Sequence, residues 1–257
     1  MSAANRPTAI LVAHGSPADP EPQEAVMKAL ALRVAMSCPG WRILGATLAA
    51  PGALEAAVAA GVAAGVAAGV VEGVVEGIAD GSGPLIYPFF MAEGWFTRTN
   101  LPRRLRACGG GALRRLAPFG TDPALPALMA RAARDGAAAA GLTPGQTTLL
   151  IAAHGGKASN APADSARAMV AKMEVLAGFG RVTAGFVEQT PFLRDAATGI
   201  GPAVCLPFFA LTAGHVAQDV PDALNAAGFQ GPLLPPIGED PGVGALIAAA
   251  LRRGMAG

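Results

Sequence analysis

Two of the three histidines in this chain occupy matched positions. His14 lies in ILVAHGS and His154 lies in LIAAHGG, each directly after a short apolar run. The third histidine, His215, follows the apolar run LPFF in the stretch LPFFALTAGHV. Imidazole changes its charge close to pH 7, so it serves both in proton transfer and as a ligand of transition metals. Histidines that follow apolar runs therefore indicate acid–base or metal chemistry.

A carboxylate accompanies the two histidines of the second half. Glu188 ends an apolar run in GFVEQTPFL. A carboxylate at the end of a buried strand needs water, a partner or a metal, because burying it alone is costly. Two imidazoles and a carboxylate can hold a divalent transition metal with open positions, and the carboxylate can accept a proton. The sequence predicts His154, Glu188 and His215 as one site. The competing role for Glu188 is that of an anion at a helix N-terminus.

The segments between these side chains alternate between strand and helix patterns. In the first half, the apolar runs at 8–13, 41–49, 84–90 and 112–118 predict strands, and the segments 21–36, 56–78, 100–107 and 122–140 predict helices. The second half repeats this order. Strands that alternate with helices predict parallel sheets covered on both faces. Ligand sites in such sheets lie beyond the carboxyl ends of the strands, where we expect all three histidines.

The two halves are related by an internal duplication. GATLAAP at 45–51 aligns with GFVEQTP at 185–191, and YPFF at 87–90 aligns with LPFF at 206–209. We therefore predict two α/β domains, residues 1–142 and 143–257, each with a parallel four-stranded sheet.

The predicted site is intact in the second half only. In the duplicate alignment, Leu48 stands at the position of Glu188 and Phe96 stands at the position of His215. His14 is thus left without partners, and one imidazole is a poor transition-metal site. It either forms a hydrogen bond within the glycine loop or is retained as a substrate contact.

Composition excludes several classes of function. The formal net charge is +1, so no excess of basic residues favours nucleic acid. The three cysteines stand far apart without a CxxC, so we expect no iron–sulfur cluster. Neither a Walker sequence nor GxGxxG supports a nucleotide. The apolar segment 56–78 contains Glu72 and Glu76, which favours a glycine-laced helix over a membrane span. The N-terminus has no signal-peptide pattern, so we expect a cytoplasmic protein.

The motifs resemble those of a known family. AHGS and AHGG after the first strand of each half, and PFFALTAGHVAQDVP after the third strand of the second, resemble the class II chelatases of tetrapyrrole biosynthesis. These are the CbiX-type sirohydrochlorin cobaltochelatases and the related ferrochelatases. The sequence departs from the usual pattern at two points: Gly156 replaces the serine of HGS, and His215 follows Gly214 directly.

The resemblance implies two flavodoxin-like halves facing across a cleft, with insertion of Co²⁺, Fe²⁺ or Ni²⁺ into sirohydrochlorin for cobalamin or sirohaem. It assigns His154 and His215 as metal ligands and Glu188 as the proton acceptor. Basic residues should receive the substrate carboxylates. The candidates for substrate contact are Lys157, Arg194 and His14, with Arg98, Arg103 and Arg104. We expect a monomer, with a weak homodimer as the alternative. Two rival functions are a non-catalytic tetrapyrrole or metal-binding protein and an enzyme that binds a phosphate ligand at the HGG loop.

Overall fold

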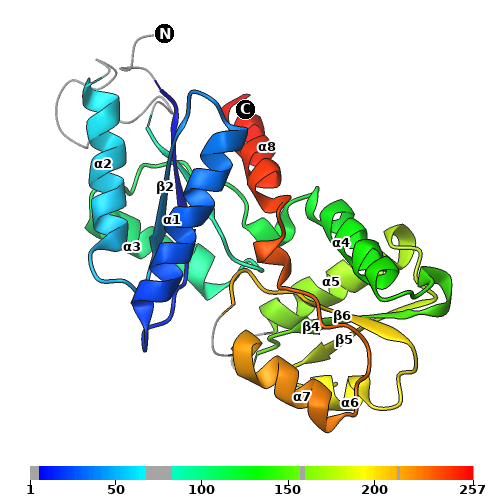
Figure 1. Cartoon of the computed structure of the whole chain (residues 1–257). Coiled ribbons are helices and arrows are strands. Elements are labelled where there is room, and N and C mark those ends of the chain that lie inside the picture. Colours follow the sequence, from blue (N-terminus) through cyan, green and yellow to red (C-terminus); the bar gives the residue numbers. More distant parts are fainter. Residues whose placement is uncertain (1–5, 68–82, 157–159, 213–214, 257) are drawn as a thin grey trace. The chain divides into compact units, whose positions relative to one another are not determined.

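The structure is a computed structural model that describes residues 6–67, 83–156, 160–212 and 215–256, with the side chains of 64–67 and 215–216 left out. Its contacts divide the chain into two compact units (Figure 1). The first unit comprises residues 1–119 and 244–257, and the second comprises residues 120–243. Each unit is an α/β fold with a parallel sheet.

The sheet of the first unit has three parallel strands in the order β2-β1-β3. They are β1 (Thr8–Ala13), β2 (Arg42–Thr47) and β3 (Leu85–Pro88). Most of β1 and all of β3 are buried. This burial explains why they read as apolar runs in the sequence, since helices cover both faces of such sheets.

The helices of the first unit come from both ends of the chain. They are α1 (Pro20–Ser37), α2 (Ala53–Ala67), the π-helix η2 (Phe96–Asn100), α3 (Leu101–Ala107) and α8 (Val243–Ala256). Ile10 and Val12 of β1 pack against α2 and α3 in one core cluster. A short 3-10 turn, η3 (Phe119–Thr121), ends the first stretch of this unit.

The second unit repeats the topology with the order β5-β4-β6. Its strands are β4 (Thr148–Ala153), β5 (Arg181–Phe186) and β6 (Ala203–Pro207). Its helices are α4 (Leu125–Ala139), α5 (Ala161–Leu176), α6 (Leu193–Ala197), the π-helix η5 (His215–Asp219) and α7 (Val220–Ala226). Two 3-10 turns complete the unit, η4 (Pro144–Gln146) and η6 (Ile237–Glu239).

The two sequence halves exchange their last helices. Helix α8 lies beside α1 (Figure 1), where Arg252 Nη1 donates to Ser37 O at 2.9 Å. Helix α4 belongs to the second unit, where Arg134 Nη1 donates to Leu176 O at the end of α5 at 3.1 Å. Contacts thus group the chain differently from the predicted domains 1–142 and 143–257, which stay a prediction from the sequence duplication.

The predicted fourth strands are wrong for the described residues. Around residue 115, the predicted strand 112–118 makes one isolated parallel bridge, from Arg115 to Ile86. Its counterpart in the second unit makes one bridge, from Leu233 to Cys205. The sheets therefore have three strands each. The helix predicted at 56–78 is observed as α2 up to Ala67, and the remainder lies outside the described residues.

The strand pairing corrects the sequence alignment of the two halves by one residue. Leu11 of β1 pairs with Gly45, whereas its duplicate Ile151 of β4 pairs with Ala184. Gly45 thus corresponds to Ala184 and not to Gly185. A shift of one residue along a strand moves each side chain to the other face of the sheet. Residues that match between GATLAAP and GFVEQTP therefore point to opposite faces of their sheets.

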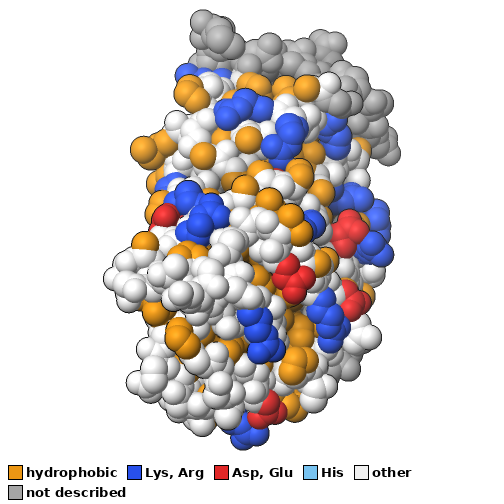
Figure 2. Space-filling view, turned by 90° about the vertical axis from the view of Figure 1, so that its right-hand side faces the viewer, with side chains coloured by type: hydrophobic (Ala, Val, Ile, Leu, Met, Phe, Trp, Pro, Cys, Tyr) orange, Lys and Arg blue, Asp and Glu red, His pale blue; other side chains and the backbone are white. Residues whose placement is uncertain are grey.

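Basic and acidic side chains are dispersed over the face that Figure 2 shows, and several acidic groups lie directly beside basic ones. Among the described residues, no helix is both long and apolar enough to cross a membrane.

Candidate active site

His154 directly follows β4, in a loop that turns sharply at Gly155. Gly155 has φ +73°, and a Cβ there would lie 2.7 Å from Gln189 Cγ, so a side chain at this position would clash. The next residue, Gly156, donates its N–H to Gln189 Oε1 at 2.8 Å. The loop is thus held against the segment after β5. The His154 side chain is 40% exposed, so ligands can reach it.

Glu188 lies beside His154 because the pairing of β4 and β5 continues past both strands. Val187 N donates to Ala153 O at 3.0 Å, and Glu188 N donates to His154 O at 3.0 Å. The carboxylate Oε2 lies 3.6 Å from His154 Nδ1. The carboxylate thus faces the imidazole at a site that water can enter.

Two acceptors near the same ring nitrogen favour one tautomer of His154. Gly155 O lies 3.3 Å from Nδ1, on the nitrogen that also faces Glu188. Both groups favour a proton on Nδ1, which places the lone pair of the neutral ring on Nε2. Carboxylates and carbonyls orient metal-binding histidines in this way. The arrangement therefore suits His154 as an Nε2 ligand.

His215 begins the π-helix η5, which follows β6. Since β4 lies between β5 and β6, the three predicted residues follow three adjacent strands. The His215 side chain and all of Lys157 lie outside the described residues. Within the described part of the chain, no group of three histidine, cysteine or acidic side chains could hold a metal. His154 and Glu188 are thus the predicted site residues whose side chains the structure brings together.

A pocket of about 550 Å³ opens next to Glu188 in the second unit. Its lining residues come from β5 and the segments after it and from the start of α7: Phe186, Val187, Glu188, Phe192, Leu193, Arg194, Asp219, Asp222 and Ala223. Arg194, predicted to receive substrate, lines this pocket and is paired with Asp195 at 3.0 Å. The pocket thus combines aromatic rings with three carboxylates and one guanidinium.

Sequence reasoning missed the pocket role of Asp219 and Asp222. Asp219 directly precedes α7, and its side chain makes no capping hydrogen bond to that helix. The signal was the spacing of the two aspartates, since an interval of three residues places two side chains on one helical face.

The position equivalent to Glu188 carries no carboxylate in the first unit. Ala49 N donates to His14 O at 2.9 Å, as Glu188 N donates to His154 O. The counterpart of Glu188 is therefore Ala49, and the alignment with Leu48 is wrong by one residue. The His14 ring instead meets the Phe96 ring edge-on, with centroids 4.2 Å apart. Its Nδ1 lies 2.7 Å from Gly15 O.

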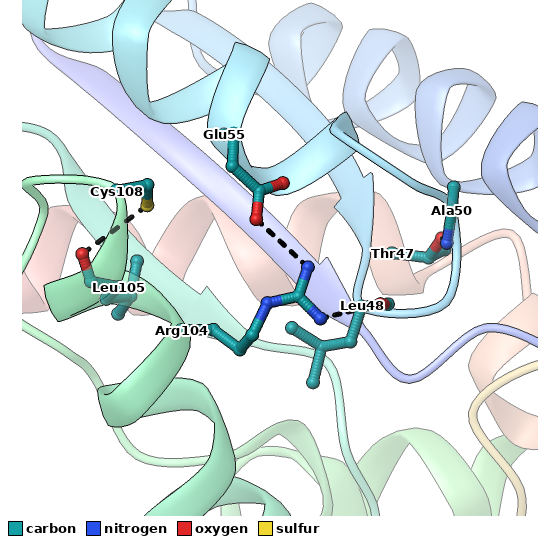
Figure 3. Close-up of polar contacts among 7 residues, drawn as sticks. All are labelled: Thr47, Leu48, Ala50, Glu55, Arg104, Leu105 and Cys108. Atoms are coloured by element: carbon teal, nitrogen blue, oxygen red, sulfur yellow. Dashed lines mark hydrogen bonds and ion pairs between the residues drawn. The ribbon is translucent and has the colours of Figure 1, made fainter.

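In the first unit, Arg104 occupies the position that corresponds to a pocket-lining residue of the second unit. Helices α3 and α7 each follow a five-residue π-helix and are seven residues long, so Arg104 corresponds to Ala223. Its guanidinium donates to Leu48 O at 3.3 Å and to Glu55 Oε1 at 3.0 Å (Figure 3). The pKa of Glu55 is lowered, first by its own backbone N–H and then by Arg104, against the opposing effect of partial burial. Arg104 thus bridges α3, the end of β2 and the first turn of α2.

Comparison with known proteins places these features in a family. The CbiX family model matches residues 148–253. A solved structure, described as CbiX, the terminal enzyme for biosynthesis of siroheme in denitrifying bacteria, is 43% identical with a TM-score of 0.81. The alignment covers 96% of this chain and 99% of that one. The chain belongs to the CbiX family. No curated protein sequence matches this CbiX family member.

More distant structures share the chelatase-like fold of the CbiX family. SirB from Bacillus subtilis with Fe³⁺ is 14% identical with a TM-score of 0.69, over 96% of this chain and 95% of that one. The sirohydrochlorin chelatase SirB from Bacillus subtilis subspecies spizizenii, in complex with cobalt, is 12% identical with a TM-score of 0.66, over 96% and 94%. At these identities the likeness shows the fold alone.

Proposed function

We propose that this protein inserts a divalent metal ion into sirohydrochlorin. The observation behind the proposal is the pair of His154 Nδ1 and Glu188 Oε2, 3.6 Å apart beyond two adjacent parallel strands. The 43% identical relative described as the terminal enzyme of siroheme biosynthesis supports the same reaction. Metal insertion needs a donor that releases its ion, and imidazole binds Co²⁺, Fe²⁺ or Ni²⁺ without the firm hold of thiolate.

The proposed reaction assigns a step to each residue. His154 presents the metal through Nε2, and His215 is the second ligand. As the metal bonds to the four ring nitrogens, the two pyrrole N–H groups lose their protons. Glu188 accepts these protons and passes them to solvent, which its side chain reaches at 25% exposure. The balanced step takes M²⁺ and free-base macrocycle to metallated macrocycle and two protons.

Loss of free-base sirohydrochlorin absorbance on addition of Co²⁺, Fe²⁺ or Ni²⁺ tests the proposal. A rate no higher than that of the spontaneous reaction with all three metals would leave only the non-catalytic tetrapyrrole or metal-binding function. Comparison of the three rates selects the metal.

We further propose that the protein acts in the cytoplasm as a monomer, as part of sirohaem or cobalamin synthesis.

Variants test the assignment of the site residues independently of the proposed reaction. General acid–base groups contribute about 10²–10⁴-fold to a rate, so Glu188→Gln should lower the insertion rate at least about 100-fold. Glu174→Gln changes an exposed carboxylate on α5 and is the matched control. His154→Ala and His215→Ala should each weaken Co²⁺ binding in calorimetric titration. If both leave binding and rate unchanged, the ligand assignment is wrong even where the reaction occurs.

A further inference from the structure

Four rings gather at the carboxyl edge of the sheet in the first unit. Phe96 is central: its ring lies 4.2 Å from His14, 5.0 Å from Trp95 and 6.2 Å from Phe90 between centroids. We name His14, Phe90, Trp95 and Phe96 the aromatic shelf. Trp95 is 55% exposed and Phe96 is 36% exposed. Phe90 packs against the core cluster of the unit, whereas the Trp95 and Phe96 rings present apolar surface to a ligand.

The aromatic shelf takes the place of metal ligands. Phe96 begins η2 as His215 begins η5, and Ala49 stands where Glu188 stands. A divalent cation finds neither a second imidazole nor a carboxylate at these two positions. Stacking on aromatic faces is what this edge offers instead, and planar conjugated molecules are the ligands that stack best.

The charges beside the two edges have opposite signs. Residues 96–107 of η2 and α3 contain four arginines, Arg98, Arg103, Arg104 and Arg106, and no acidic residue. The equivalent residues 215–226 of η5 and α7 contain Asp219 and Asp222 and no Lys or Arg. Because Glu93 and Glu55 pair with Arg98 and Arg104, the other two arginines are the ones that favour an anion at the first segment, whereas the two aspartates of the second segment favour a cation.

The arginines differ in their freedom to meet a ligand. Arg104 is held by Leu48 O and Glu55, and Arg98 is paired with Glu93. Arg103 and Arg106 are exposed, and neither forms an ion pair within the part of the chain that the structure describes. Guanidinium groups form strong bidentate hydrogen bonds with carboxylates. Arg103 and Arg106 therefore suit the rim of a polycarboxylate.

We propose that the aromatic shelf and the arginines of η2 and α3 bind the tetrapyrrole, so that the half without metal ligands is the macrocycle-binding half. One face of the macrocycle stacks on Trp95 and Phe96, and rim carboxylates pair with Arg103 and Arg106. The inference rests on the proposed function for its choice of ligand, a flat polycarboxylate. It differs from that function because binding by the shelf needs no metal.

The test measures binding of sirohydrochlorin without metal, in the presence of a chelator and without oxygen. The chain has two tryptophans, so Trp41→Phe leaves Trp95 as the only one. Quenching of its fluorescence on titration gives the Kd. In the chain with both tryptophans, absorbance titration compares Trp95→Ala, Trp95→Phe and Arg103→Ala. We expect Trp95→Ala to weaken binding about 5- to 10-fold, since stacking on one ring contributes that much, and Trp95→Phe to retain most of the affinity.

Matched controls lie on the same unit away from the shelf. Arg42 is an exposed arginine at the start of β2, the opposite edge of the sheet. Met36 is an 83% exposed apolar side chain on α1. Arg42→Ala and Met36→Ala should leave the Kd unchanged, whereas Arg103→Ala should raise it and reduce its salt dependence. Unchanged far-UV circular dichroism shows that the variants are folded.

The outcomes separate this inference from the proposed function. If Trp95→Ala and Arg103→Ala bind as the parent protein does, the shelf is not the binding surface, and metal insertion can still be measured. If both lose affinity but no metal is inserted, the shelf is supported and the chelatase function is wrong. If the unmodified protein does not bind sirohydrochlorin, the inference is wrong.

Discussion

The exchange of α4 and α8 predicts that one buried side chain in each helix stabilises the unit on the other side of the sequence duplication. Leu251 of α8 and Met129 of α4 are both fully buried, at 0% exposure. Leu251 belongs to the first unit and Met129 to the second. Leu251→Ala should therefore loosen the sheet that begins at Thr8, although Leu251 ends the sequence half that contains His154.

The size of the effect follows from the lost packing. Truncating a fully buried leucine or methionine to alanine costs about 2–5 kcal/mol, depending on how far the site collapses. A cost of about 3 kcal/mol raises the equilibrium constant for opening roughly 150-fold, at about 1.4 kcal/mol per factor of ten. Amide hydrogen exchange measures such opening segment by segment.

Hydrogen exchange with mass spectrometry checks the assignment on peptides from β1 and β4. We expect Leu251→Ala to speed exchange in β1 far more than in β4, and Met129→Ala to do the reverse. The opposite pattern would show that each sequence half folds with its own last helix. Equal acceleration of both sheets by both variants would show that the units do not open separately. Either result would refute the exchange as an energetic division of the chain.

Further predictions concern buried groups. Burial raises the pKa of the Cys205 thiol from 9.0 to about 12, so the thiol of the folded protein should resist alkylation at pH 8. The free energy of unfolding should fall by about 1.4 kcal/mol per pH unit above about pH 9, because only the thiol of the unfolded chain ionises there. Cys205→Ala should remove that part of the pH dependence in urea titrations. A Cβ on Gly45 would lie 2.3 Å from Met27 O, so Gly45→Ala should cost about 1–3 kcal/mol in urea unfolding, whereas Gly145→Ala, with nothing within 4 Å, should cost little. Glu24→Gln should cost about 1–3 kcal/mol by the same measurement, because the buried Glu24 carboxylate accepts from Thr47 N at 2.7 Å.

The strands and long helices could be predicted because burial leaves a direct record in the sequence. The strand predicted at 8–13 is observed as Thr8–Ala13, and the helix predicted at 21–36 is observed as Pro20–Ser37. A central parallel strand is covered on both faces and must be apolar along its length. The placement of His154 and Glu188 followed from the same rule, since parallel strands end at one edge.

The register of the second strand could not be predicted, because the letters of the two halves favour the wrong match. Aligning Gly45 with Gly185 is the better match by residue type, yet Gly45 approaches Met27 of α1 and Gly185 approaches Leu193 of α6. Both positions need glycine for close packing, but on opposite faces. Sequence identity records the need for a small residue and not the face on which it is needed.

The exchange of helices α4 and α8 between the units could not be predicted from the sequence either. The segments LAPFGTDPALPALMARAARDG and LPPIGEDPGVGALIAAALRRG are similar because each ends one copy of the duplicated unit. Their helices, α4 and α8, are similar in sequence, so the sequence does not tell to which unit each one belongs. The unit of each helix is set by contacts between residues far apart in the sequence, which leave no periodic signal.

Duplication resolves a conflict in the proposed reaction. A chelatase must hold a cation and a polyanionic macrocycle at once, and a carboxylate such as Glu188 that serves the metal repels the substrate rim. Like charges at close range in a partly desolvated site cost free energy. With two copies of one edge, acidic residues can lie on η5 and α7 of one unit while arginines lie on η2 and α3 of the other. In the proposed reaction, a first edge with its own metal ligands would compete with His154 and His215 for the ion, so Ala49 and Phe96 favour selective binding of the metal at the second edge.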